Sequence, residues 1–179
     1  MIHRAVLHLR TDQDLVATLY AHDAGSPARM LPRIAAFLTE EPAGDLGRFL
    51  AHTLNDAEER LVLVPAGNEP GDIDHRWTLS GTINSVKAQR LILTCEAIHV
   101  NTDNETIADS TVVYTGNREI LNGAISALRD TAADFECEVK ATVSGPITQA
   151  FAQEVAAMHA KADSLFVDLL ALTSEDAEQ

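Results

Sequence analysis

Hydrophobic residues at the start of the chain form two short runs separated by polar positions. Residues 2–9 and 14–21 are rich in aliphatic and β-branched side chains, and the polar residues Arg-Thr-Asp-Gln at 10–13 lie between them. Two runs of strand formers joined by a short polar segment are typical of a hairpin. The sequence therefore predicts an N-terminal β-hairpin.

The hydrophobic spacing changes to three and four residues after Ser26-Pro27, a pair that favours a helix start. In the first predicted helix the apolar positions are Leu31, Ile34, Phe37 and Leu38. In the second they are Leu46, Phe49, Leu50 and Leu54. Asp45 suits the cap of this second helix, which we expect to run to about Glu59.

The middle of the chain returns to strand-forming residues. Short runs at 61–65, 75–81, 90–100 and 110–115 predict further strands, and the glycine-, proline- and acid-rich segment 66–74 predicts a loop. Gly116-Asn117 then opens a helix that turns Ile120, Leu121, Ile125 and Leu128 inward. The alternation of Cys137, Val139, Ala141 and Val143 predicts one last strand.

The final helix, beginning near Pro146, has the most regular pattern. Its apolar residues are spaced alternately by four and three, and we call this row the heptad seam: Phe151, Val155, Met158, Ala162, Leu165, Leu169 and Leu172. A row with this period requires a helical partner. The partner is either the helix beginning near Asn117 or the same helix in a second subunit, which would make a homodimer. The large seam residues are the candidate interaction residues.

These elements together predict one α+β domain over residues 1–179. We expect a mainly antiparallel sheet that begins with the N-terminal hairpin, and about four helices that include the long C-terminal amphipathic one. Trp77, the only tryptophan, lies within a predicted strand and is expected in the core. The acidic tail at 173–179 is expected to fray.

The net charge of the chain argues against nucleic acids and anionic membranes as partners. Thirteen Lys and Arg stand against 27 Asp and Glu, which gives a formal net charge of -14. Such a surface repels phosphates and anionic lipids, so we expect neither direct nucleic-acid binding nor membrane binding. No stretch approaches the roughly 18 apolar residues of a spanning helix, and Met1 to Arg4 lacks a signal-peptide pattern. Cys95 and Cys137 fit buried, reduced thiols, so we expect a cytoplasmic protein.

Known catalytic motifs are missing from the sequence. The nine glycines do not cluster as a phosphate-binding loop requires, and the nearest phrase to a nucleophile elbow, at 79–82, supplies one serine and one glycine. The two cysteines stand far apart, and no His-x-x-x-His helix exists. We therefore predict no cofactor and no firm metal site.

Two loops hold the remaining candidates for metal binding or acid–base chemistry. His22 and Asp23 lie in the first loop, at 22–27, and Asp72, Asp74 and His75 lie at the end of the second, at 66–75. Imidazole and carboxylate groups can hold a divalent metal or act as a base with its orienting partner. If the loops meet, a small-ligand or metal-dependent enzyme is the alternative function. Polar loop residues more often cap turns than catalyse.

Roughly residues 1–120 resemble an uncharacterised family of small phage and prophage accessory proteins. The features shared in order are Ile2-His3-Arg4, Leu19-Tyr20, the turn from His22 to Pro27, Ala35 to Leu38, and Asp72-Ile73-Asp74-His75. The turn here lacks the opening glycine of the family pattern. The resemblance implies a small α+β accessory protein of a mobile element, acting in a bacterial cytoplasm, and it transfers no functional residue.

The absence of catalytic motifs, the heptad seam and the acidity favour a non-catalytic protein that binds and modulates another protein, with a basic partner as one possibility. A nucleic-acid mimic, in which carboxylates replace phosphates, is a further alternative. It ranks lower because the acids are scattered along the chain in ones and twos.

Overall fold

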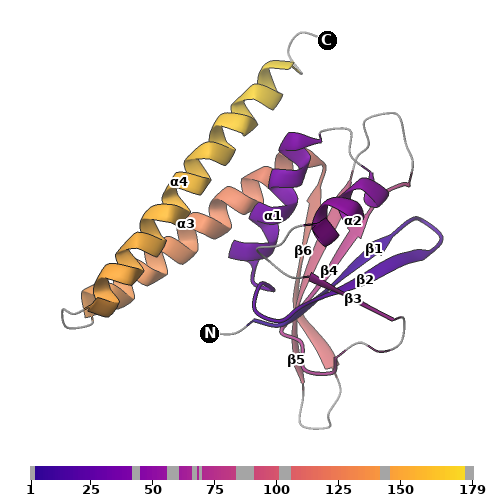
Figure 1. The fold of residues 1–179 in the computed structure, drawn as a ribbon, viewed down its shortest axis with the longest axis horizontal. Coiled ribbons are helices and arrows are strands. Elements are labelled where there is room, and N and C mark those ends of the chain that lie inside the picture. The colour runs from indigo at the N-terminus through magenta and orange to yellow at the C-terminus, as the bar shows by residue number, and fades with distance from the viewer. Residues whose placement is uncertain are drawn as a thin grey trace. The chain divides into compact units, whose positions relative to one another are not determined.

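The computed structural model describes residues 3–41, 45–55, 61–65, 68, 70–83, 91–100, 106–141 and 146–175. Within them the predicted α+β class is confirmed, with a hairpin first and a long helix last (Figure 1). The strands are β1 (Ala5–Arg10), β2 (Leu15–Ala21), β3 (Leu61–Val64), β4 (His75–Ser80), β5 (Ile92–Val100) and β6 (Thr106–Thr115). The helices are α1 (Pro27–Glu40), α2 (Leu46–Asn55), α3 (Asn117–Ala141) and α4 (Pro146–Glu175).

The chain divides into two compact units. The sheet unit comprises Met1–Ser26 and Phe37–Asn117, and the helical unit comprises Pro27–Ala36 and Arg118–Gln179. Helix α1 contributes its first part to the helical unit and its last residues to the sheet unit. The single domain expected over 1–179 stays a prediction.

The six strands of the sheet unit are ordered β3-β2-β1-β4-β5-β6. All neighbours are antiparallel except the central pair β1 and β4, which run parallel with Leu7 opposite Trp77. The hairpin of β1 and β2 turns at Thr11, whose hydroxyl accepts a hydrogen bond of 2.9 Å from the Asp14 amide. The predicted N-terminal hairpin is therefore confirmed.

The core of the sheet unit lies on one face of the central strands. A row of buried side chains, Leu19, Leu7, Trp77 and Cys95, crosses four paired strands. Trp77 is fully buried, as expected, and its indole N–H donates to the Gly25 carbonyl at 3.0 Å. A side chain at Gly25 would place its Cβ 2.6 Å from that of Ala5 and 2.8 Å from the His3 carbonyl oxygen. This close approach explains glycine at that turn.

Helix α2 is capped at its start by Asp45 and held to α1 by one aromatic contact. The Asp45 carboxylate accepts from the Arg48 amide at 2.9 Å, so the predicted cap is confirmed. Phe49 is buried and meets Phe37 edge to face, with 5.2 Å between ring centroids. The helix ends at Asn55, and residues 56–59 of its predicted extent lie outside the described residues.

The helical unit corrects three expectations. The strand predicted at 137–143 is wrong, because α3 runs on to Ala141, and residues 142–143 lie outside the described residues. Cys137 is exposed on that helix, so of the two cysteines only Cys95 is buried. Helix α4 continues to Glu175, so residues 173–175 of the expected frayed tail are helical, and 176–179 are not among those described.

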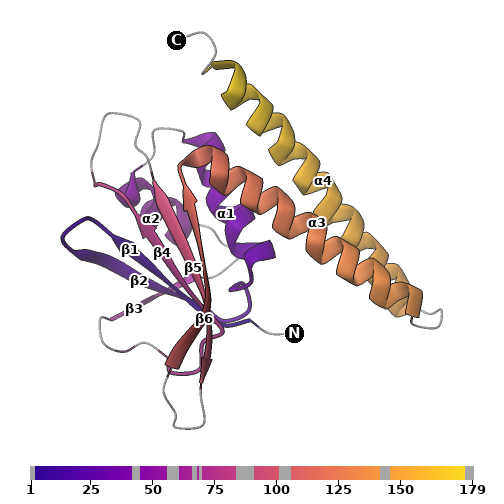
Figure 2. The ribbon, with the colours of Figure 1, turned by 180° about the vertical axis from the view of Figure 1, so that it is seen from behind.

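Helices α3 and α4 lie side by side in both views of the ribbon (Figures 1 and 2). In the part of the chain that the structure describes, no helix is both long enough and apolar enough to cross a membrane.

Candidate functional site

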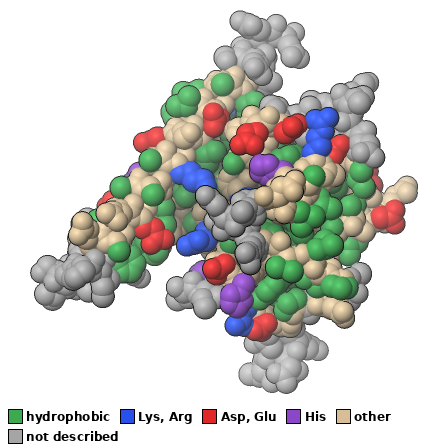
Figure 3. Space-filling view, viewed as in Figure 1, with side chains coloured by type: hydrophobic (Ala, Val, Ile, Leu, Met, Phe, Trp, Pro, Cys, Tyr) green, Lys and Arg blue, Asp and Glu red, His purple; other side chains and the backbone are tan. Residues whose placement is uncertain are grey.

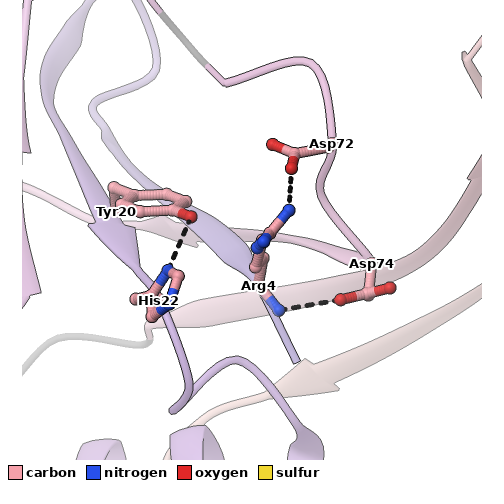
Figure 4. A network of polar contacts seen from close by, with 5 residues as sticks. All are labelled: Arg4, Tyr20, His22, Asp72 and Asp74. Carbon is pink, nitrogen blue, oxygen red and sulfur yellow. Dashed lines mark hydrogen bonds and ion pairs between the residues drawn. The ribbon is translucent and has the colours of Figure 1, made fainter. Parts of the chain in front are cut away.

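Of the two loops singled out by the sequence, the second is fixed by contacts of Arg4, just before β1. The Arg4 guanidinium pairs with the Asp72 carboxylate, and the Arg4 amide donates to the Asp74 carboxylate at 2.8 Å. Figure 4 shows these contacts and a second set, in which the Tyr20 hydroxyl lies 3.4 Å from Nδ1 of His22. We call Arg4, Asp72 and Asp74 the Arg4 cluster. Asp23 is exposed.

The Arg4 cluster attaches the acidic loop to the sheet. The Asp74 amide donates to the Arg4 carbonyl at 2.8 Å, and the Asp74 carbonyl accepts from the Ile98 amide at 2.7 Å. Between the two aspartates, Ile73 packs in a small buried cluster with Val6 and Ile98, beside Tyr20. Asp72 and Asp74 therefore flank an apolar anchor and link β1, β4 and β5.

The ion pair of Arg4 with Asp72 weighs against the hypothesis that the loop residues hold a divalent metal. The guanidinium occupies the place beside Asp72 that a cation would take, because both neutralise a carboxylate. Among the described residues, no group of three or more His, Cys, Asp or Glu is arranged to hold a metal ion. A metal at Asp72 would have to displace Arg4.

His75 has a different environment from the carboxylates. Its ring meets that of His3 edge to face at 5.8 Å and stacks on Trp77 at 6.5 Å. Burial lowers the pKa of His75, as does the nearby His3, while Asp74 acts in the opposite direction. Its buried Nδ1 has no hydrogen-bond partner among the described residues. The neutral ring is therefore the favoured form in the folded chain.

The heptad seam of α4 lies toward α3. Contacts between the two helices include the Phe135 and Phe151 rings at 5.6 Å, Arg129 with Asp163 at 3.4 Å, and Glu136 with His159 at 3.4 Å. At the seam positions Val155, Ala162, Leu165 and Leu169 are buried, and Phe151, Met158 and Leu172 are half-buried. The seam residues are therefore largely packed against α3 within this chain, and a homodimer through the seam stays a prediction.

A second apolar surface on α4 was missed in the sequence. Phe166, Val167 and Leu170 are 43%, 65% and 52% exposed, and we call them the outer patch. Their spacings of three and four residues place them on one side of the helix, away from the seam positions. The signal was present, because a heptad seam gives no reason for apolar residues at these positions.

Arg129 on α3 contacts both the outer patch and an acid of α4, Asp163. Its guanidinium carbon lies 6.0 Å from the centroid of the Phe166 ring, and the same group pairs with Asp163. An arginine over an aromatic face holds the ring in place. The Phe166 ring is therefore positioned from α3, although nearly half of the residue is exposed.

Comparison of the chain with protein-family models, with curated proteins and with solved structures finds no match.

Proposed function

We propose that this chain is a non-catalytic, acidic accessory protein that binds another protein through the outer patch of α4, and that the bound element is an amphipathic helix with basic flanks. The observation that carries the proposal is the exposure of Phe166, Val167 and Leu170 within little more than one helical turn. Contiguous exposed apolar side chains with a polar border are typical of protein interaction sites.

The shape of the surface favours a helix as the bound element. Figure 3 shows hydrophobic side chains reaching the surface along α4 as well as over the sheet. On α4 the patch residues project from one helix face at spacings of three and four, which match the apolar face of a second helix. A partner helix laid along this face would bury all three side chains.

The charge around the patch favours a basic partner over a second copy of this chain. Asp163 and Asp168 stand beside the patch residues in the sequence of α4, and the side chain of Asp163, although it pairs with Arg129, is 75% exposed. Between residues 149 and 172 the helix carries three acids and one lysine, in a chain of net charge -14. A second copy would bring acids against acids, whereas basic flanks would pair with them.

The resemblance of residues 1–120 to phage accessory proteins implies context only: an accessory protein of a mobile element, acting in a bacterial cytoplasm.

The test uses the intact chain and a labelled synthetic peptide about three heptads long, with Leu at the core positions and Lys elsewhere. We expect fluorescence anisotropy to show binding to the wild type, weakening as NaCl is raised from about 0.05 M to about 0.5 M. The double variant Phe166→Ser with Leu170→Ser should bind about tenfold more weakly. A peptide with Glu in place of Lys should not bind.

The matched control is the double variant Val62→Ser with Leu63→Ser on β3, where both residues are also about half exposed, at 55% and 54%. It should bind the Lys peptide as the wild type does. Equal affinity of the wild type and the α4 variant would show attraction to the acidic chain in general, and it would overturn the proposal. So would failure of the wild type to bind the Lys peptide.

A further inference from the structure

Among the described strands, β6 forms one long edge of the sheet. It is the last strand in the order and spans ten residues, whereas β3, at the opposite edge, spans four. Among the described strands β6 pairs only with β5. The outer side of such a strand presents backbone N–H and C=O groups that a further strand can bond.

The side chains along most of β6 are exposed to solvent. Every residue from Ile107 to Val113 is exposed. Val112 and Val113 point to opposite faces of the sheet, yet they are 47% and 54% exposed. Both faces of the strand are therefore accessible along this stretch.

The two halves of β6 differ in how well they can accept a strand. A register shift opposite Ala97 and Ile98 leaves Asp109 as the extra residue of a bulge, and Asp109 is the only charged residue of the strand. Bulges and charges are the common protection of sheet edges. The other half, Ser110 to Thr115, pairs regularly with β5 and has no charge.

We propose that β6 pairs antiparallel with β6 of a second copy of this chain, about a two-fold axis at Val112, so that the two sheets become continuous. The unpaired backbone groups at a sheet edge can be bonded by an extended strand. The segment from Ser110 to Tyr114 can itself supply that strand, because its residues make favourable pairs with those of a second copy. With Val112 opposite Val112, the flanking pairs are Thr111 with Val113 and Ser110 with Tyr114, all uncharged. Cross-strand pairs of β-branched and aromatic residues stabilise a sheet.

The charge distribution is compatible with this register. Asp109 lies three residues from the axis, so the two Asp109 carboxylates are separated by about 20 Å at roughly 3.3 Å per residue. Charges this far apart are largely screened at physiological salt. The remaining repulsion comes from the net charge of -14 on each copy, so added salt should strengthen the dimer. This is the opposite of the salt dependence proposed for the helical partner.

Sedimentation velocity on the full chain tests the proposal. The wild type at about 100 µM should form a dimer that is more populated at about 0.5 M than at about 0.05 M NaCl. Val112→Lys places two ammonium groups opposite each other and should weaken dimerisation at least tenfold. Val112→Glu should do the same, and an equimolar mixture of the two variants should recover the dimer.

The matched control is Leu63→Lys on β3, whose native residue is 54% exposed at the other edge. It should dimerise as the wild type does, and circular dichroism should confirm that all variants fold. A monomeric wild type at high salt would overturn the proposal. So would a dimer that survives both Val112 variants, or one that depends on Phe166 and Leu170 instead, because that would assign self-association to α4.

Discussion

The sheet unit and the α3–α4 hairpin bury their large side chains in different ways. In the sheet unit Trp77, Phe37 and Phe49 are all at most 1% exposed. In the α3–α4 hairpin the fully buried positions are Ile120 and Leu121 near the start of α3 and the alanines at 124, 132 and 162, while Phe166 is 43% exposed. A residue between packed layers can be enclosed completely, whether on a strand, as Trp77 is, or on a helix, as Phe37 and Phe49 are, whereas two helices enclose only a narrow stripe of each other. The α3–α4 hairpin therefore has exposed apolar side chains, those of the outer patch, that a partner could contact.

The largest expected effect is the loss of stability when the buried Trp77 ring is removed from the sheet unit. Trp77→Ala removes a fully buried ring and its hydrogen bond to Gly25, so we expect a loss of about 3–5 kcal/mol in the free energy of unfolding. Urea titration followed by circular dichroism measures it. Trp77→Phe keeps most of the volume, and it provides a value if the alanine variant does not fold. A loss below about 1 kcal/mol in Trp77→Ala would contradict the proposed enclosure.

A matched pair of substitutions on α4 tests the hairpin side. Leu165 is 4% exposed and Leu170 is 52% exposed, so the same change to alanine probes the seam and the outer patch separately. We expect about 2–3 kcal/mol for Leu165→Ala and less than about 0.5 kcal/mol for Leu170→Ala. Thermal unfolding measures both. Equal losses would mean that Leu170 is also packed and unavailable to a partner.

The smallest expected effect is a pH dependence confined to the sheet unit. Because the pKa of His75 is lowered in the folded chain, the unfolded chain binds more protons as the pH falls below about 6.5. The stability that depends on neutral His75 is therefore present above that pH and is lost below it. His75→Gln should lose less stability than the wild type between neutral and mildly acidic pH in urea titrations. Identical pH profiles of the wild type and His75→Gln would contradict this assignment to His75.

The fold was predictable where local pattern decides it. The N-terminal β-hairpin of β1 and β2, the cap at Asp45 and the start of α3 follow from spacing and turn chemistry. The parallel pairing of β1 with β4 was not predictable, since alternation tells which face a residue takes and not which distant strand lies beside it. At 137–143 the alternation suggested a strand, but the helical spacing of Ile125, Leu128, Ala132 and Phe135 continues from α3. A helix already formed extends more easily than a new strand begins.

The candidate site was predictable in part. The sequence indicated Asp72, Asp74 and His75, and the structure gives all three specific contacts. It did not indicate Arg4 as their partner, because about 70 residues separate them and only the pairing of β1 with β4 brings them together. The outer patch was visible as apolar residues outside the heptad seam, and the large seam residues, which stay the predicted interaction residues, are buried or half-buried in the α3–α4 hairpin.

The burial of Cys95 gives the two thiols different chemical fates. Burial, with a smaller effect of Glu96, raises the pKa of the Cys95 thiol to about 12, so its reactive thiolate is a very small fraction at neutral pH. Cys137 is exposed on α3. Oxidants and alkylating reagents therefore meet Cys137 first and reach Cys95 only when the packing over its face of the sheet opens. Modification of Cys95 thus reports how often that packing opens.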